Sequence, residues 1–61
     1  MELKERDILT KALLDEQEKV RDFETHSKSL KDPEARKVFK KMAEDHGYHA
    51  RELQQLLDKF E

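Results

Sequence analysis

Three residues whose side chains can bind metal ions or exchange protons stand at positions where apolar residues are expected: Glu16, His46 and His49. His49 follows His46 by three residues, so in a helix the two imidazoles lie on one face, one turn apart. Two imidazoles with a carboxylate opposite can bind zinc, iron, manganese, cobalt or nickel. The alternative is that both histidines are buried and hydrogen-bonded to Glu16 without any ion.

Each of the three residues interrupts a regular repeat in which the steps alternate between four and three residues. The first repeat consists of Leu9, Leu13, Glu16, Val20, Phe23, Ser27 and Leu30. The second consists of Ala35, Phe39, Met42, His46, His49, Leu53, Leu56 and Phe60. Such spacing is typical of one buried stripe along an α-helix. Because burying an unpaired polar group costs roughly 2–7 kcal/mol, we expect the polar members to have partners, with a metal ion as the leading candidate.

The single proline divides the chain into two helices. Asp32 is a suitable N-cap, and Pro33 fits the first position of the helix that follows. The residue before a proline avoids helical conformations, so the first helix should end by Lys31. We therefore expect helices at about residues 3–30 and 33–60, and the short connection makes them antiparallel neighbours.

The predicted fold class is all-α: an antiparallel helical hairpin that forms one domain over residues 1–61. Glu16 is about as far before Asp32 as His46 and His49 are after it, so the three should share one layer. Two helices cannot enclose their apolar stripes, and a chain of about 60 residues buries little surface. We therefore expect a homodimer, or a higher even oligomer, in which two hairpins form a four-helix bundle.

The composition excludes several other kinds of function. The chain has 13 Lys and Arg against 15 Asp and Glu, with no basic block, so we expect no nucleic-acid partner. No apolar run approaches the roughly 18 residues of a membrane span, and no signal peptide opens the chain, so we expect no membrane association and a cytoplasmic location. The absence of cysteine excludes disulfides and thiolate metal sites. We assign no catalytic residue and no organic cofactor.

Asp45 is the fourth candidate ligand. It lies next to the second stripe and four residues before His49, where it could orient that imidazole or bind the ion itself. The alternative for Asp45 is an ordinary surface position.

The sequence also resembles a known family over about residues 8–58. The stretch from Ala12 to Glu16, followed by Phe23-Glu24, is similar to the first helix of rubrerythrin-like, ferritin-like domains. The runs from Lys31 to Ala35 and from Phe39 to Asp45 resemble the family's turn and the start of its second helix. The run His49-Ala50-Arg51-Glu52-Leu53 matches the histidine end of the family's Glu-x-x-His motif.

This resemblance implies a ferritin-like four-helix bundle with an iron site, which small single-hairpin members build across a dimer. Glu16 and His49 would be ligands, while His46 stands where the family has a bridging glutamate. Two copies of Glu16 then supply only two carboxylates, which fits a single ion per site or an atypical dinuclear site better than a standard di-iron centre. An inward-turned Asp45 would restore the charge balance.

The function that we expect is therefore metal binding with iron or oxidant handling, of the ferroxidase or peroxidase kind. Iron is the first expectation for the divalent metal, with zinc or manganese as alternatives. Two other interpretations stay open. One is a non-catalytic dimeric helical interaction module whose buried polar layer fixes the register, and the other is a structural zinc that stabilises the dimer.

Overall fold

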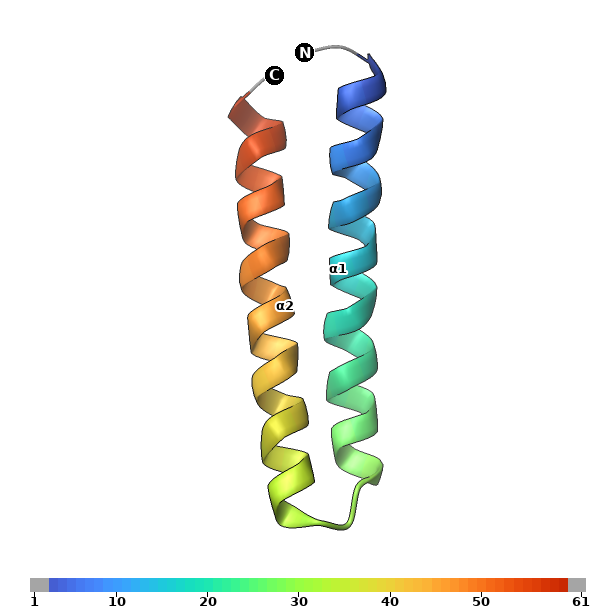
Figure 1. Cartoon of the computed structure of the whole chain (residues 1–61), viewed down its shortest axis with the longest axis vertical. Coiled ribbons are helices and arrows are strands. Elements are labelled where there is room, and N and C mark those ends of the chain that lie inside the picture. The colour runs from blue at the N-terminus through green and yellow to red at the C-terminus, as the bar shows by residue number, and fades with distance from the viewer. Residues whose placement is uncertain (1–2, 60–61) are drawn as a thin grey trace.

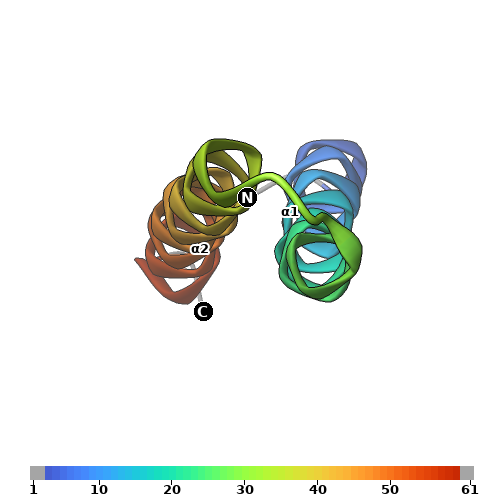
Figure 2. The same cartoon turned by 90° about the horizontal axis from the view of Figure 1, so that it is seen from below.

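The structure is a computed structural model of the 61-residue chain, and it describes residues 3–59. Two antiparallel helices, α1 (Leu3–Ser29) and α2 (Pro33–Lys59), are joined by a short turn (Figure 1). No strand occurs in residues 3–59, and the extents of the Cα trace are 46 × 14 × 10 Å. Viewed from the turn, the helices lie side by side, slightly inclined to one another (Figure 2). The all-α helical hairpin predicted from the sequence is confirmed.

The turn is fixed by contacts of Asp32 and Arg36. The Asp32 carboxylate accepts a hydrogen bond of 2.8 Å from the backbone N–H of Ala35, as an N-cap does. The backbone N–H of Arg36 donates to the Asp32 carbonyl at 3.1 Å, which is the first hydrogen bond of α2. The Arg36 side chain donates to the Leu30 carbonyl and so satisfies an acceptor just beyond the end of α1.

The face of α1 that packs on α2 is the predicted stripe. Leu13 and Ser27 are buried, and the other members from Leu9 to Leu30 are partly buried. The Ser27 hydroxyl donates to the Glu24 carbonyl at 2.7 Å, so this buried polar group has a partner in its own helix.

The face of α2 differs from the predicted stripe at three positions. Ala43 and Leu57 are buried in the contact with α1, whereas Met42 and Leu56 are 39% and 43% exposed and the side chain of His49 is 53% exposed. The predicted burial of these three residues is wrong for the single hairpin. The physical reason is that one neighbouring helix covers a narrower strip than the four-three repeat marks out. Phe60, the last predicted member, lies outside the described residues.

The core between the two helices is thin. Its buried apolar residues are Leu13, Ala43 and Leu57, and no side chain in residues 4–59 is completely buried. Among the described residues, neither helix is both long and apolar enough to cross a lipid bilayer. A domain of this size has little stability to spare, so each contact between the helices matters.

Gly47 lies in the middle of α2 although nothing in the hairpin requires a glycine there. Its backbone has no positive φ, and an added Cβ would meet no atom within 4 Å. Glycine in a helix interior costs about 1 kcal/mol relative to alanine. We therefore expect Gly47→Ala to increase the free energy of unfolding by about 0.5–1 kcal/mol, measured by urea denaturation followed by circular dichroism at fixed protein concentration. A lower stability of this variant would show that another chain packs closely against Gly47.

Candidate metal centre

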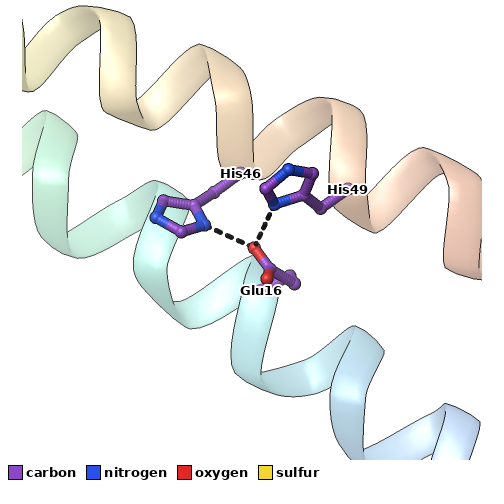
Figure 3. Close-up of side chains that lie close together, drawn as sticks. All are labelled: Glu16, His46 and His49. Carbon is purple, nitrogen blue, oxygen red and sulfur yellow. Dashed lines mark hydrogen bonds and ion pairs between the residues drawn. The ribbon is translucent and has the colours of Figure 1, made fainter.

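The three candidate residues lie at the midpoints of the two helices. Glu16 has 13 residues of α1 on either side, and His46 has 13 residues of α2 on either side. In a hairpin with helices of equal length, the two midpoints face each other, and His49 lies one turn beyond His46 (Figure 3). The single layer predicted from the distances to the turn is therefore present in the structure.

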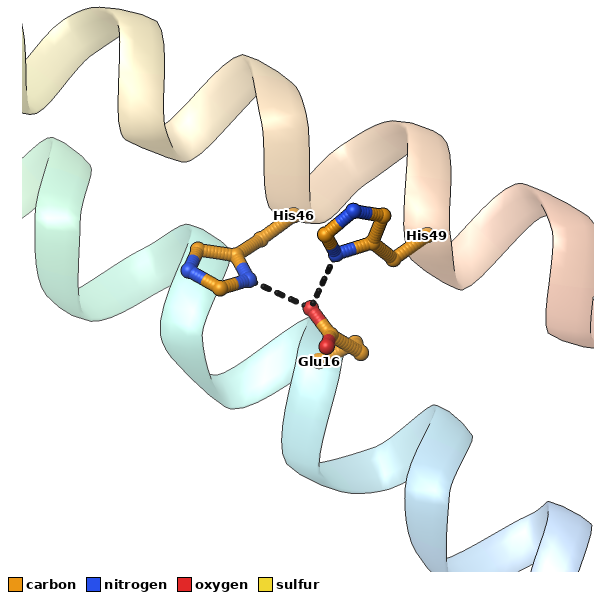
Figure 4. Close-up of polar contacts among 3 residues, drawn as sticks. All are labelled: Glu16, His46 and His49. Carbon is orange, nitrogen blue, oxygen red and sulfur yellow. Dashed lines mark hydrogen bonds and ion pairs between the residues drawn. The ribbon is translucent and has the colours of Figure 1, made fainter.

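One carboxylate oxygen contacts both imidazoles. Oε2 of Glu16 is 2.5 Å from Nδ1 of His46 and 3.4 Å from Nδ1 of His49 (Figures 3 and 4). One potential ligand atom from each of the three side chains lies within 4.8 Å of the other two. The Glu16 and His46 side chains are about one-fifth exposed, whereas that of His49 is about half exposed. The site is therefore sheltered on the side of His46 and open on the side of His49.

Aromatic rings hold His46 in position. Its imidazole is stacked on Phe23, with centroids 5.4 Å apart and an interplanar angle of 17°. Phe23 in turn meets the edge of Phe39 at 5.2 Å, and the ring of His49 stands edge-on to His46 at 5.5 Å. Sequence reasoning placed Phe23 and Phe39 in the core but gave them no part in the site. The only signal was that Phe23 lies seven residues after Glu16, on the same helix face.

The carboxyl group of Glu16 is ionised at neutral pH. Burial by itself raises the pKa of this group, but the hydrogen bonds and charges of His46 and His49 together lower it by more. The net pKa is therefore below its ordinary value. A carboxylate held in its charged form beside two imidazoles is the protonation state that metal ligation requires.

The spacing of the three groups fits a transition-metal ion after a small adjustment. Ligand atoms at about 2.1 Å from a tetrahedral ion are about 3.4 Å from one another. The distance between Glu16 and His49 already has this value, whereas Glu16 and His46 are in direct hydrogen-bond contact at 2.5 Å. Binding an ion requires these two groups to separate by about 1 Å and to lose their shared proton. Three protein ligands leave a coordination position open for water or a small substrate.

The structure does not bring Asp45 to the other three residues. Its carboxylate instead accepts from the Lys41 ammonium at 3.2 Å, one turn earlier on the same helix, and its side chain is 47% exposed. The clustered group in residues 3–59 consists of Glu16, His46 and His49 without it. A role for Asp45 as a ligand stays a prediction.

The candidate site lies at the contact between the two helices. It is separate from the shallow groove between α1 and α2. That groove, of about 420 Å³, includes Val20, Ser27, Ala43 and Gly47 in its lining but none of the three candidate ligands.

Comparison with protein-family models, with curated proteins and with solved structures gives no match to this chain. The ferritin-like resemblance therefore stays a prediction.

The lowered pKa of Glu16 predicts a pH dependence of stability. A carboxyl group whose pKa is lower in the folded chain stabilises the fold above its unfolded pKa, and this contribution is lost as the pH falls through the folded pKa. In metal-free buffer, the stability difference between the parent and Glu16→Gln should therefore shrink as the pH falls below about 4.5. Urea denaturation at a series of pH values between 6 and 3, monitored by circular dichroism, measures this difference.

The matched control for this experiment is Glu18→Gln, a substitution at an exposed position of the same helix. It removes the same charge without touching His46 or His49. A stability difference between parent and Glu16→Gln that stays constant down to pH 3 would contradict the assigned contacts.

Proposed function

We propose that this hairpin binds a divalent transition-metal ion through Glu16, His46 and His49. The observation that carries the proposal is that donor atoms from both helices converge within 4.8 Å at the midpoint of the hairpin. The contact between the helices is otherwise apolar and aromatic around this layer. A carboxylate and two imidazoles at such a position have a physical use as metal ligands, and their cost as partly buried polar groups is then offset.

Metal binding would also stabilise the fold. The ligands come from both α1 and α2, so an ion that binds only the folded chain links the two helices. This contribution is valuable in a hairpin whose buried apolar core consists of Leu13, Ala43 and Leu57. The chain has no cysteine that could supply a disulfide instead.

The ligand set narrows the choice of metal. Two imidazoles and one carboxylate are found both in zinc sites with an open position and in non-haem iron sites. Iron is the first choice because the sequence resembles ferritin-like domains, and zinc and manganese are the alternatives. Bound iron with an open position would supply oxidation of ferrous ion or reduction of peroxide, which is the iron- and oxidant-handling activity that we propose.

In this proposal, a second hairpin completes the surroundings of the metal site. One carboxylate and two neutral imidazoles leave one positive charge on each divalent ion, and His49 is half exposed on the open side. Pairing two hairpins into a four-helix bundle would bury that side and surround the metal layer with protein.

A second function is favoured by a specific contact. The hydrogen bond between Glu16 and His46 is 2.5 Å long, and no buried side-chain polar atom in residues 3–59 lacks a partner. The polar layer is therefore satisfied without an ion. On this alternative the protein is a non-catalytic dimeric interaction module whose polar layer fixes the register of the helices, as a buried Asn does in a coiled coil.

Metal content separates these functions. We expect about one ion per chain in protein without an affinity tag, after anaerobic loading with ferrous iron or with zinc, measured by plasma mass spectrometry. Glu16→Gln and His49→Asn should each lower the affinity by at least about 10-fold, because each removes one of only three ligands. Oxidation of bound ferrous iron by oxygen or peroxide, followed optically, would favour iron handling over a structural zinc.

His26→Asn is the matched control, since His26 is exposed on α1 and is not part of the cluster. Asp45→Asn tests the fourth candidate ligand in the same titration. No metal above background in the loaded parent, or equal affinity in the parent and both ligand variants, would leave the interaction module as the better account.

A further inference from the structure

The exposed apolar side chains of α2 lie on the side where the candidate metal site opens. Val38, Met42 and Leu56 are 43%, 39% and 43% exposed. With His49 they are spaced at four, seven and seven residues, which places them along one stripe of the helix. This stripe runs beside the contact with α1 and passes directly over the half-exposed imidazole.

Ile8 of α1 lies on this same side. It precedes Glu16 by eight residues, as Val38 precedes His46 by eight, and Glu16 faces His46 across the contact. Both helices are right-handed and run in opposite directions, so equal steps from two facing residues lead to the same side of the hairpin. Ile8 is 61% exposed. We call the surface formed by Ile8, Val38, Met42, His49 and Leu56 the open face.

The side of the hairpin that carries the groove has a different character. Its lining includes the small residues Ser27, Ala43 and Gly47 together with charged side chains from both helices. The remaining large apolar residues that are exposed, Leu14 and Tyr48, lie on the outer surfaces of α1 and α2. The open face is thus where a second layer of helices would bury most apolar surface and cover the site.

The charge distribution favours one orientation of that second layer. Residues 25–43, around the turn, contain six Lys or Arg against two Asp or Glu. The rest of the chain contains seven Lys or Arg against 13 Asp or Glu. A second copy that ran in the same direction would place two basic turns side by side. A copy turned end for end would separate the two basic turns and place each beside residues 3–7 and 49–59 of its partner, which contain four Lys or Arg against four Asp or Glu.

The position of the candidate ligands agrees with the same orientation. Glu16 and His46 are at the midpoints of helices of equal length, so turning a copy end for end returns its ligand layer to the same level. Both helices of each copy then lie beside helices of the other copy along their whole length. A site nearer one end of the hairpin would be carried away from its counterpart by this rotation.

We propose that a second copy of this chain docks on the open face, turned end for end about a two-fold axis through the layer of Glu16 and His46. The role of the docked pair rests on the proposed function. In this role, each copy covers the open side of the other copy's metal site. The half-exposed His49 of each copy becomes enclosed, and the partner's Glu16, His46 and His49 join the same polar layer.

This arrangement sets specific neighbours. Because the two-fold axis is perpendicular to the helices and parallel to the docked faces, each helix lies along the same helix of the partner in the opposite direction. Residues of α2 that are equally far from His46 on its two sides are therefore level across the contact. Val38 is then within two residues of the level of the partner's Leu56, and Met42 is within one residue of the level of the partner's His49. The ion pairs Lys11–Asp15 and Lys41–Asp45, at 2.8 and 3.2 Å, occupy equivalent positions and form a charged rim around the apolar contact.

Engineered cysteines test the orientation without ambiguity because the chain has none of its own. We expect the double variant Val38→Cys/Leu56→Cys to form a covalent dimer on mild oxidation, seen by non-reducing electrophoresis. Within one chain these positions are about 27 Å apart, since they are 18 residues apart on α2. Disulfides need Cα atoms about 4.4–6.8 Å apart, so the bond must join two chains.

Two further cysteine pairs make the result decisive. Leu14→Cys/Tyr48→Cys places equally exposed cysteines on the outer surfaces and reports random collision. Ile8→Cys/Leu56→Cys reports a partner that runs in the same direction, in which Ile8 is within two residues of the level of the partner's Leu56. A covalent dimer from the 38/56 pair at least about tenfold faster than from the 14/48 pair supports the proposal. A faster interchain bond from the 8/56 pair than from the 38/56 pair, or no difference between 38/56 and 14/48, overturns it.

A mass measurement addresses the docking surface by itself. Sedimentation equilibrium of the parent should give the mass of two chains, and Val38→Lys/Leu56→Lys should weaken association at least about tenfold while Leu14→Lys/Tyr48→Lys does not. Circular dichroism checks that each variant is helical at the concentration used. A helical parent that stays monomeric at high concentration overturns the docking.

Failure of the docking and failure of metal binding are distinguishable. The cross-linking is carried out without added metal, and the metal titration uses the parent chain without cysteines. A rapid 38/56 cross-link in protein that binds no metal overturns the proposed function and leaves the docking. Metal binding without that cross-link overturns the docking and leaves the metal site.

Discussion

One carboxylate oxygen between two imidazoles is the contact on which the rest of this molecule depends. Oε2 of Glu16 reaches across from α1 to His46 and His49 on α2, and it does so at the midpoint of both helices. The contact gives partners to polar groups that would otherwise be costly in an apolar stripe. It also favours this alignment of the helices, because moving Glu16 one turn toward the start of α2 would leave it facing Met42 and Ala43.

The second constraint is the small amount of apolar surface that two helices can bury. A hairpin with a thin core and a half-exposed histidine is an incomplete arrangement on physical grounds. A metal ion would complete the polar layer, and a second copy would complete the apolar one. The two additions act at the same place, since the exposed stripe of Met42, His49 and Leu56 runs over the open side of the polar layer.

Much of the fold could be predicted from particular residues. Asp32 and Pro33 locate the turn by local stereochemistry, and the equal distances from the turn place Glu16, His46 and His49 in one layer. The spacing could not say how many helices would share the contact, which is why Met42, His49 and Leu56 were expected to be buried. The pairing of Asp45 with Lys41 also escaped prediction, because a local ion pair competes with the candidate site for that carboxylate. The stacking of Phe23 on His46 depends on side-chain orientations that a repeat does not specify.

The central claim is that Glu16, His46 and His49 together hold one metal ion. X-ray absorption spectroscopy at the zinc edge, on protein loaded with one equivalent of zinc, tests it most directly. The account predicts a shell of nitrogen and oxygen atoms at about 2.0–2.1 Å with the outer-shell scattering of two imidazoles per ion. A spectrum with oxygen ligands alone, or one that is unchanged in the double variant His46→Asn/His49→Asn, would contradict the account.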